Sequence, residues 1–327
     1  MKLIAAFVAA IALFGAVATT RNRPPDDPIA LAYQALIAKD LRLATVGYHL
    51  AQGSAAYCRN TWRNPGWVLH DERQYPDLAL AHRAFTFRKP VSIAALVTGG
   101  PAARAGLQPG DGLTAADGSV VWYDPAAKDQ RPTSGRIDGL RETIAMRLSE
   151  GRPIRFGIAT ANGHRDLILD PPAVCASDFW VDVRSKRDAG ADGKRVRVTS
   201  GLIDYVRDDD ELAAVVAHEM AHNLLDHRPR IEASKSGKTK VIKATEAEAD
   251  RLSVWLMANA GYDPEAAISF WQRYGKATGL GIFSAPTHYR WQTRVAMLRE
   301  EIDLMSRSPA GDDRRDPPLL AAHRAKQ

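Results

Sequence analysis

Two histidines that flank a glutamate are the residues of this chain best suited to chemistry. His218 and His222 are four positions apart in the run V-V-A-H-E-M-A-H-N-L-L-D-H, residues 215–227, so on a helix both imidazoles project from one face. Two neutral imidazoles one turn apart can occupy two corners of a tetrahedral zinc site. Glu219 stands between them, where its carboxylate can hold a water on the metal without being a ligand. The spacing therefore predicts a zinc ion that activates water.

The residues around this motif favour a helix. Asp208, followed three positions later by Glu211, is typical of a helix N-terminus. An apolar stripe with helical spacing follows at Leu212, Val215, Val216 and Met220. H-E-x-x-H on a helix is the arrangement found in zinc metallopeptidases. The alternative is a helix that carries two histidines beside a carboxylate by chance, and a third ligand would exclude it.

A third zinc ligand is expected from a second helix. The run E-A-E-A-D begins at Glu246, near the start of a helix predicted over residues 244–259. Glu246 and Asp250 are four apart on one face, and the small Ala249 beside them allows close approach to the first helix. We therefore expect Glu246 to bind zinc and Asp250 to accept a hydrogen bond from a ligating histidine. The alternative for Glu246 is an exposed helix carboxylate.

Two neighbouring residues are expected to have ordinary structural roles. Glu248 points away from the ligand face and is expected to be solvated. His227 follows the motif by five positions and lies off that face. We interpret it as a cap at the C-terminal end of its helix, where a cationic side chain suits the helix dipole.

At this point the chain resembles the gluzincin endopeptidases related to the HtpX heat-shock protease and the CAAX prenyl proteases. The resemblance covers residues 179–299 and includes V-R-V-T-S-G-L at 196–202, H-E-M-A-H, E-A-E-A-D and T-H-Y-R-W-Q-T-R at 287–294. The chain departs from the family in two places. Tyr289 stands where many relatives have proline, and residues 188–193 read D-A-G-A-D-G instead of N-A-x-A-D-G. Both departures concern the positioning of substrate.

The resemblance implies a cofactor and a set of roles. It implies one Zn²⁺ per chain, with Glu219 as the general base and three ligands: His218, His222 and Glu246. It also implies that His288 and Arg294 lie near the metal, where they gate the site or stabilise the developing oxyanion.

The expected fold class is α+β, with a mainly helical zincin-type metallopeptidase domain that carries a small edge sheet. Residues 179–183 and 195–199 are alternating stretches joined by a glycine-rich turn, which predicts a hairpin. In metallopeptidases of this architecture an edge strand pairs with the extended substrate above the zinc. We assign that role to Arg195, Val196, Arg197, Val198 and Thr199. The basic segment 228–243 is predicted to be a loop, either a mobile lid or an idle surface loop.

A separate module is expected between the N-terminal helix and the peptidase region, at residues 89–170. Its glycine-rich run G-G-P-A-A-R-A-G-L-Q-P-G-D-G follows a predicted strand, and a helix and a further strand come after it; these elements are predicted at 91–97, 138–150 and 153–159. The pattern resembles a PDZ domain of the bacterial protease-associated kind, a β-sandwich or barrel. Such domains bind an extended peptide at a sheet edge, with residues 84–87 as the candidate carboxylate loop here. The alternative is a module that only spaces or shields the active site.

The N-terminus predicts export. Lys2 precedes an unbroken apolar run that ends in A-V-A at residues 16–18, which is typical of a secretory signal peptide. The alternative is an uncleaved membrane anchor, although the run is shorter than the roughly 20 residues of a spanning helix. The expected organisation is a signal peptide at 1–18, a helical segment at 19–88, the module at 89–170, the peptidase domain at 171–306 and a flexible tail at 307–327. The expected location is the periplasm or cell envelope.

The two cysteines of the chain, Cys58 and Cys175, are expected to form a disulfide, since an even count in an exported protein favours pairing. The alternative is two buried free thiols. Such a bond would tie the N-terminal helical region to the start of the peptidase region, with the module between them.

Composition sets the remaining limits. The chain has 327 residues, 45% hydrophobic and 25% charged, with a net charge of +6. No concentrated basic face with interleaved aromatic residues is visible, so nucleic acid is not an expected partner, whereas peripheral contact with an anionic membrane surface is compatible with the charge. The sequence thus predicts a zinc endopeptidase acting on extended or misfolded envelope proteins. The alternatives are a non-catalytic zinc-stabilised scaffold or chaperone and the hydrolysis of a non-peptide amide.

Overall fold

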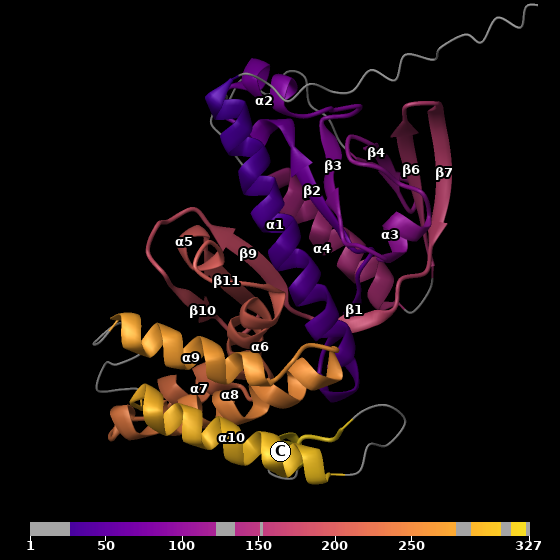
Figure 1. The fold of residues 1–327 in the computed structure, drawn as a ribbon. Helices are drawn as coiled ribbons and strands as arrows, with labels where there is room; N and C mark the ends of the chain where they lie inside the picture. The colour runs from indigo at the N-terminus through magenta and orange to yellow at the C-terminus, as the bar shows by residue number, and fades with distance from the viewer. Residues whose placement is uncertain (1–26, 122–134, 151–152, 279–288, 309–314, 325–327) are drawn as a thin grey trace, which may run out of the picture.

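The computed structural model describes residues 27–121, 135–150, 153–278, 289–308 and 315–324. The long helix α1 (Pro28–Gly53) connects the two halves of the molecule (Figure 1). It begins at Asp27, whose carboxylate accepts hydrogen bonds from the first free N–H groups, and Pro28 fits the first helical position because its missing N–H needs no partner there. Because α1 contacts β2 and β3 as well as α6, α8 and β9, it packs against both halves.

The first half is an antiparallel sheet with its own hydrophobic core. The strand order is β2-β3-β4-β6-β7, with β5 paired to β4. Two helices accompany the sheet, α3 (Pro101–Arg104) and α4 (Gly135–Ser149). The strands are β2 (Trp67–Asp71), β3 (Val91–Leu96), β4 (Gly112–Ala116), β5 (Ser119–Val120), β6 (Ile154–Thr160) and β7 (Gly163–Leu169). Ile93, Leu113 and Phe156 form part of a core that is separate from that of the helical half.

This sheet begins earlier in the chain than the sequence pattern indicated. The expected module started at residue 89, but β2 lies before it and pairs with β3. A short 3-10 helix (Glu72–Gln74) and helix α2 (Leu78–Ala84) separate the two strands, so the sequence does not read as a hairpin. The two strands are nevertheless neighbours, and β2 forms one edge of the sheet.

The second half contains four longer helices and a three-stranded sheet. The helices are α6 (Asp209–Leu224), α8 (Lys238–Asn259), α9 (Glu265–Thr278) and α10 (Trp291–Arg307). The strands are β9 (Asp178–Asp182), β10 (Ala189–Ala191) and β11 (Arg195–Thr199), in the order β10-β11-β9. Short helix α5 (Ser200–Ile203) follows β11 directly. The buried side chains of α6 and α8 lie at the centre of the main core.

The topology of this small sheet corrects two predictions. Strands β9 and β11 are parallel, so they are not the two arms of a hairpin; β10 and β11 form the antiparallel pair. Strand β11 (Arg195, Val196, Arg197, Val198 and Thr199) is hydrogen-bonded on both sides and is therefore the central strand, not an edge. The short strand β10 occupies the edge instead. A three-residue run of small residues, A-G-A, gives little strand signal on its own.

Two segments expected to be irregular contain regular structure. Residues 228–243 are mostly helical, because α7 (His227–Glu232) and the first turn of α8 occupy them. The predicted flexible tail contains α11 (Pro318–Arg324), whose Leu320 is buried. The Arg315 carbonyl also accepts hydrogen bonds from Tyr57 at 3.1 Å and Asn259 at 3.0 Å. Apolar burial and these bonds hold residues 315–324 against the helical half.

A disulfide links Cys58 to Cys175, as expected from the sequence. Cys175 ends β8 (Ala173–Cys175), which pairs with β1 (Thr61–Arg63). The bond therefore joins the residues just before the larger sheet to the residues just after it. Among the described helices, none has the length and apolar character needed to cross a membrane. The expected signal peptide, residues 1–18, lies outside the described part of the chain.

Candidate metal centre

Helix α6 positions the two histidines. Asp208 caps the helix by accepting a hydrogen bond from the Glu211 N–H at 2.8 Å. Every residue from Leu212 to Ala221 is buried, so both the position and the rotation of the helix are fixed by the core. The Nε2 atoms of His218 and His222 lie 3.2 Å apart and face the same space.

Helix α8 contributes the third potential ligand. Its Ala249 is fully buried, which allows the close packing of α6 and α8 that the sequence indicated. The Glu246 carboxylate lies 3.3 Å from His218 Nε2 and 3.4 Å from His222 Nε2. These three residues form a group able to hold a metal ion. Ligands about 2.0–2.1 Å from a tetrahedral zinc are about 3.3–3.4 Å from one another, so the spacing fits zinc.

His218 is held from behind by a buried ion pair. Its Nδ1 lies 3.0 Å from Asp250 Oδ1, and Arg294 Nε donates to Asp250 Oδ2 at 2.7 Å. Burial alone would raise the pKa of Asp250, but Arg294 and His218 outweigh burial and lower that pKa. The Arg294 guanidinium also lies over the Trp271 ring, 3.4 Å from its centroid. The role expected for Asp250 thus agrees with the geometry.

Arg294 lies near the potential ligands, as the resemblance implied, but behind one of them. Its guanidinium approaches Nδ1 of His218 at 3.4 Å, on the side of the ring away from Nε2 and Glu246. Arg294 is almost fully buried and does not border the cleft described below. Its place behind the imidazole suits the positioning of Asp250 and His218 and not contact with an oxyanion. The other residue expected near the metal, His288, lies outside the described residues.

His222 is held by a different set of residues, which corrects two predictions. His227 does not cap a helix end. It begins α7, is buried, and places its Nδ1 2.9 Å from His222 Nδ1. Glu248 is not simply solvated, because it contacts His227 Nε2 at 3.0 Å and Arg230 at 2.5 Å. Burial lowers the pKa of His227 and thereby favours its neutral form.

The hydrogen-bond pattern assigns the protons in this chain of residues. If Nε2 of His222 faces the metal, its Nδ1 carries the proton and donates to Nδ1 of His227. Nε2–H of His227 then donates to the Glu248 carboxylate. Little in the sequence indicated this arrangement, because the partners lie on three helices. The only available signal was a third histidine shortly after the motif.

Glu219 lies beside the ligands on α6. Burial raises the pKa of its carboxyl to about 7, although His218 opposes the shift. Burial also lowers the pKa of His222, to about 3. For His218, burial lowers the pKa, but hydrogen bonds with Asp250 and Glu246 outweigh burial and raise it to about 10. A carboxyl with a pKa near neutrality can accept and return a proton, as a general base must.

These side chains open into a cleft of about 470 Å³, which we call the metal cleft. The three potential ligands and Glu219 border it on one side, and β10 with its flanking turn borders it on the other. Asn223 of α6 fastens the hairpin to the helix: it accepts from Gly193 N at 2.7 Å and donates to Arg195 O at 3.3 Å. These hydrogen bonds therefore fix the position of β10 relative to the three potential ligands.

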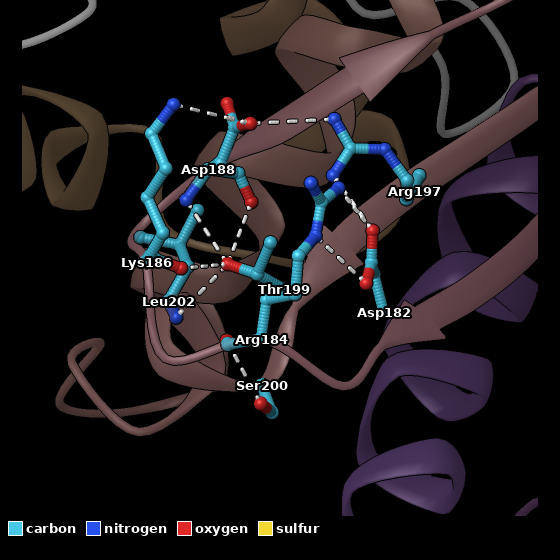
Figure 2. Close-up of polar contacts among 8 residues, drawn as sticks. All are labelled: Asp182, Arg184, Lys186, Asp188, Arg197, Thr199, Ser200 and Leu202. Carbon is cyan, nitrogen blue, oxygen red and sulfur yellow. Dashed lines mark hydrogen bonds and ion pairs between the residues drawn. The ribbon is translucent and has the colours of Figure 1, made fainter.

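A network of polar contacts supports the start of this edge strand (Figure 2). The Thr199 hydroxyl, at the end of β11, donates to Lys186 O at 2.5 Å and accepts from Asp188 N at 3.0 Å. Arg197 bridges Asp182 and Asp188 across the sheet. Residues of β11 thus act by holding β10 in place. Sequence reasoning singled out Arg197 and Thr199 but gave them a different role.

Comparisons with known proteins agree with this site. The chain is 27% identical to the mitochondrial metalloendopeptidase OMA1 of Schizosaccharomyces pombe, in an alignment of 142 positions. That alignment covers 33% of this chain and 41% of the yeast protein, so the chain spans less than half of its relative. Residues 184–241, which include the edge strand and the H-E-x-x-H helix but end before Glu246, match the model of Peptidase family M48.

Proposed function

We propose that this protein is a zinc-dependent endopeptidase that cleaves extended or misfolded polypeptides of the cell envelope. The observation that carries the proposal is the spacing of three ligand atoms, 3.2–3.4 Å apart, beside a buried glutamate in an open cleft. The match to a metallopeptidase family over the same helix supports it. Export is supported by the basic, apolar N-terminus and by the disulfide, which suits an oxidising compartment.

Four residues of the chain would carry out the proposed reaction, three as metal ligands and one as the general base. Zinc held by His218, His222 and Glu246 would supply a water of lowered pKa and polarise the scissile carbonyl. Glu219 would accept the proton of that water as it attacks and deliver it to the leaving amine. The raised pKa of Glu219, about 7, suits both steps near neutral pH.

The edge strand β10 would hold the substrate in extended form. Its partner β11 occupies one side, and its other side borders the metal cleft. An extended peptide paired with this edge would have its carbonyl groups fixed relative to the ligands. Because a strand edge pairs with backbone groups, the site favours extended chains over folded ones and depends little on side-chain identity.

A non-catalytic scaffold or chaperone is disfavoured by Glu219. A carboxyl whose pKa is raised by burial destabilises the fold at neutral pH, so a purely structural zinc site would gain from its replacement. A structural site also has four protein ligands, whereas this group offers three among the described residues.

The direct test is Glu219→Gln, with cleavage of a casein-type substrate and bound zinc measured on the same protein. We expect zinc content to be unchanged and the cleavage rate to fall at least about a thousandfold, because the base is lost and the ligands are kept. Glu265→Gln, at an exposed carboxylate of α9, is the matched control and should cleave normally. Full activity in Glu219→Gln would exclude the proposed mechanism.

A further inference from the structure

The metal cleft has a third side, formed by α7 and the first turn of α8. Arg228, Ile231, Glu232 and Lys238 line the cleft there, in addition to the potential ligands and β10. We call this side the α7–α8 wall. It belongs to the basic segment 228–243, which contains six lysine or arginine residues and a single glutamate. The wall therefore brings positive charge to the place where a substrate would lie.

The charges that line the cleft are compensated within the protein, except for one. Arg228 Nε donates to Glu232 at 2.9 Å, so these two residues of the wall neutralise each other. On the β10 side, the Asp188 carboxylate lies 3.4 Å from Arg197. Lys238 is exposed and forms no ion pair with any described residue. Its ammonium group is thus available to a carboxylate that enters the cleft.

Helix stability does not account for a lysine at this position. Lys238 is the first residue of α8, which follows Gly237 and has neither a capping side chain nor an acidic residue in its first turn. Helix α6 shows the favourable pattern, with an aspartate cap and acidic residues at the next three positions. A cation in the first turn opposes the helix dipole. A residue that breaks a local rule in this way is often retained for function.

An extended substrate would present side chains to Lys238. A peptide paired with β10 has its side chains on alternate faces, so every second residue points to the same part of the cleft. Half-buried Ile231 offers an apolar surface on the same wall. A glutamate could place its methylene groups against that surface and its carboxylate beside the Lys238 ammonium group, whereas a lysine would be repelled.

We propose that Lys238 is a specificity-determining residue, which pairs with a glutamate or aspartate of the substrate within a few residues of the bond that is cleaved. The inference rests on the proposed function and narrows its substrate class to extended polypeptides with an acidic residue near the cleavage site. Exposed ion pairs have small energies, equivalent to factors of up to about five. Lys238 therefore adds a graded preference to the backbone pairing with β10.

The first test measures kcat/KM of the zinc-loaded wild type on a set of eight-residue peptides. The host is an uncharged sequence that the enzyme cleaves once, and glutamate, glutamine or lysine is placed at each position in turn. We expect glutamate to exceed glutamine by about threefold to fivefold, and glutamine to exceed lysine by a similar factor. The effect should appear at one position, or at two positions separated by one residue. A uniform effect at every position would overturn the proposal.

Two substitutions of Lys238 test whether it is the source of the preference. Lys238→Met keeps an unbranched apolar stem and removes the charge, so glutamate and glutamine peptides should be cleaved equally well. Lys238→Glu should reverse the order and favour lysine peptides. Because glutamate suits the first turn of a helix, Lys238→Glu should unfold in urea at no lower concentration than the wild type. Reversed specificity would then not be a consequence of unfolding.

The same segment supplies matched controls. Lys235 and Lys240 are exposed lysines that do not line the cleft, so Lys235→Glu and Lys240→Glu should keep the glutamate preference. An equal loss in all three lysine variants would overturn the proposal, because it would indicate a general attraction to the basic segment. In 1 M salt, where the Debye length is about 3 Å, the preference of the wild type should fall towards one. A preference unchanged by salt would also contradict the ion pair.

Binding without cleavage separates failure of this inference from failure of the proposed function. Fluorescent versions of the same peptides are titrated into Glu219→Gln protein loaded with zinc, with and without Lys238→Glu. Cleavage by the wild type with no preference for glutamate would remove the role of Lys238 and leave the peptidase. Glutamate-selective binding that depends on Lys238, in a protein whose wild type cleaves nothing, would keep the role of Lys238 and remove the peptidase.

Discussion

Two groups of carboxylates differ in how their charges are partnered: those that support the metal ligands, and those that line a cavity of about 420 Å³ bordered by α1, β2, α4 and β9, which we call the β2 cavity. Behind the metal ligands, the supporting carboxylates have partners close by: Asp250 pairs with Arg294, and Glu248 with His227. In the β2 cavity, Asp40 forms no ion pair with any described residue. A carboxylate with a fixed partner holds the side chain that it contacts in one position, as metal coordination requires. A partly buried carboxylate without such a partner costs stability.

The largest expected effect comes from removing the carboxylate ligand. Glu246→Gln should reduce zinc affinity by about a thousandfold or more, since a neutral amide is a poor zinc ligand and only two imidazoles remain. Competition with a chelator measures this directly. Asp40→Asn, in the β2 cavity, is the matched control and should bind zinc as the wild type does. Normal zinc binding in Glu246→Gln would mean that the cleft is not the metal site.

The pH dependence of zinc binding tests whether Asp250 and Glu246 raise the pKa of His218. Burial lowers the pKa of His218 in the metal-free protein, but its hydrogen bonds to the Asp250 and Glu246 carboxylates outweigh burial and raise the pKa to about 10. Below that pH His218 is protonated, and zinc must displace the proton. Apparent zinc affinity should therefore rise about tenfold per pH unit, or about a hundredfold between pH 6 and pH 8. Asp250→Asn removes one cause of the raised pKa and should flatten the slope; an equally steep slope in that variant would contradict the assignment.

The support of His222 by His227 predicts a smaller effect. His227→Phe keeps a ring of similar size but removes the acceptor for His222 Nδ1–H and the donor to Glu248. Zinc affinity should fall about tenfold, the lower end of the usual range for such indirect contacts. His227→Gln, which can still accept and donate, should recover part of the loss. If Phe and Gln variants bind zinc equally well, the hydrogen bonds do not position the imidazole and His227 is only a packing residue.

The sequence was informative where the geometry is local. His218, Glu219 and His222 lie within five consecutive residues, so helical spacing alone places them on one helix, and the E-A-E-A-D run supplies Glu246 in the same way. Strand order is not local. Alternation identified β11 as a strand but could not show that β9 and β10 flank it on both sides.

The contacts that support the site could not be predicted from the sequence either, because the partners come from separate helices. His227 meets Glu248 only when α7 packs against α8. The β2 cavity is the extreme case. Asp40, Trp62, Arg141 and Asp178 come from four segments, and each reads as an ordinary helix or strand residue until the fold brings them together.

The smallest expected effect is on the free energy of unfolding, which is lowered at neutral pH because the Asp40 carboxylate has no ion-pair partner among the described residues. The pKa of Asp40 is raised by burial from 3.8 to about 6, so the folded protein binds more protons than the unfolded chain between these pH values. Stability is therefore lost as pH rises through this window, and the deficit is complete above about pH 6.

Asp40→Asn should thus stabilise the protein at pH 7.5, by on the order of 1 kcal/mol after allowance for the partial exposure of the site. The gain should shrink towards zero near pH 4, where the wild-type carboxyl is protonated in both states. Urea unfolding at the two pH values measures it, with Asp166→Asn as the exposed control. Asp250, behind His218, predicts the opposite sign, because its lowered pKa stabilises the fold at neutral pH and this contribution is lost on acidification. A destabilising Asp40→Asn at pH 7.5 would mean that the carboxylate has a partner after all, and the contrast between the two sites would disappear.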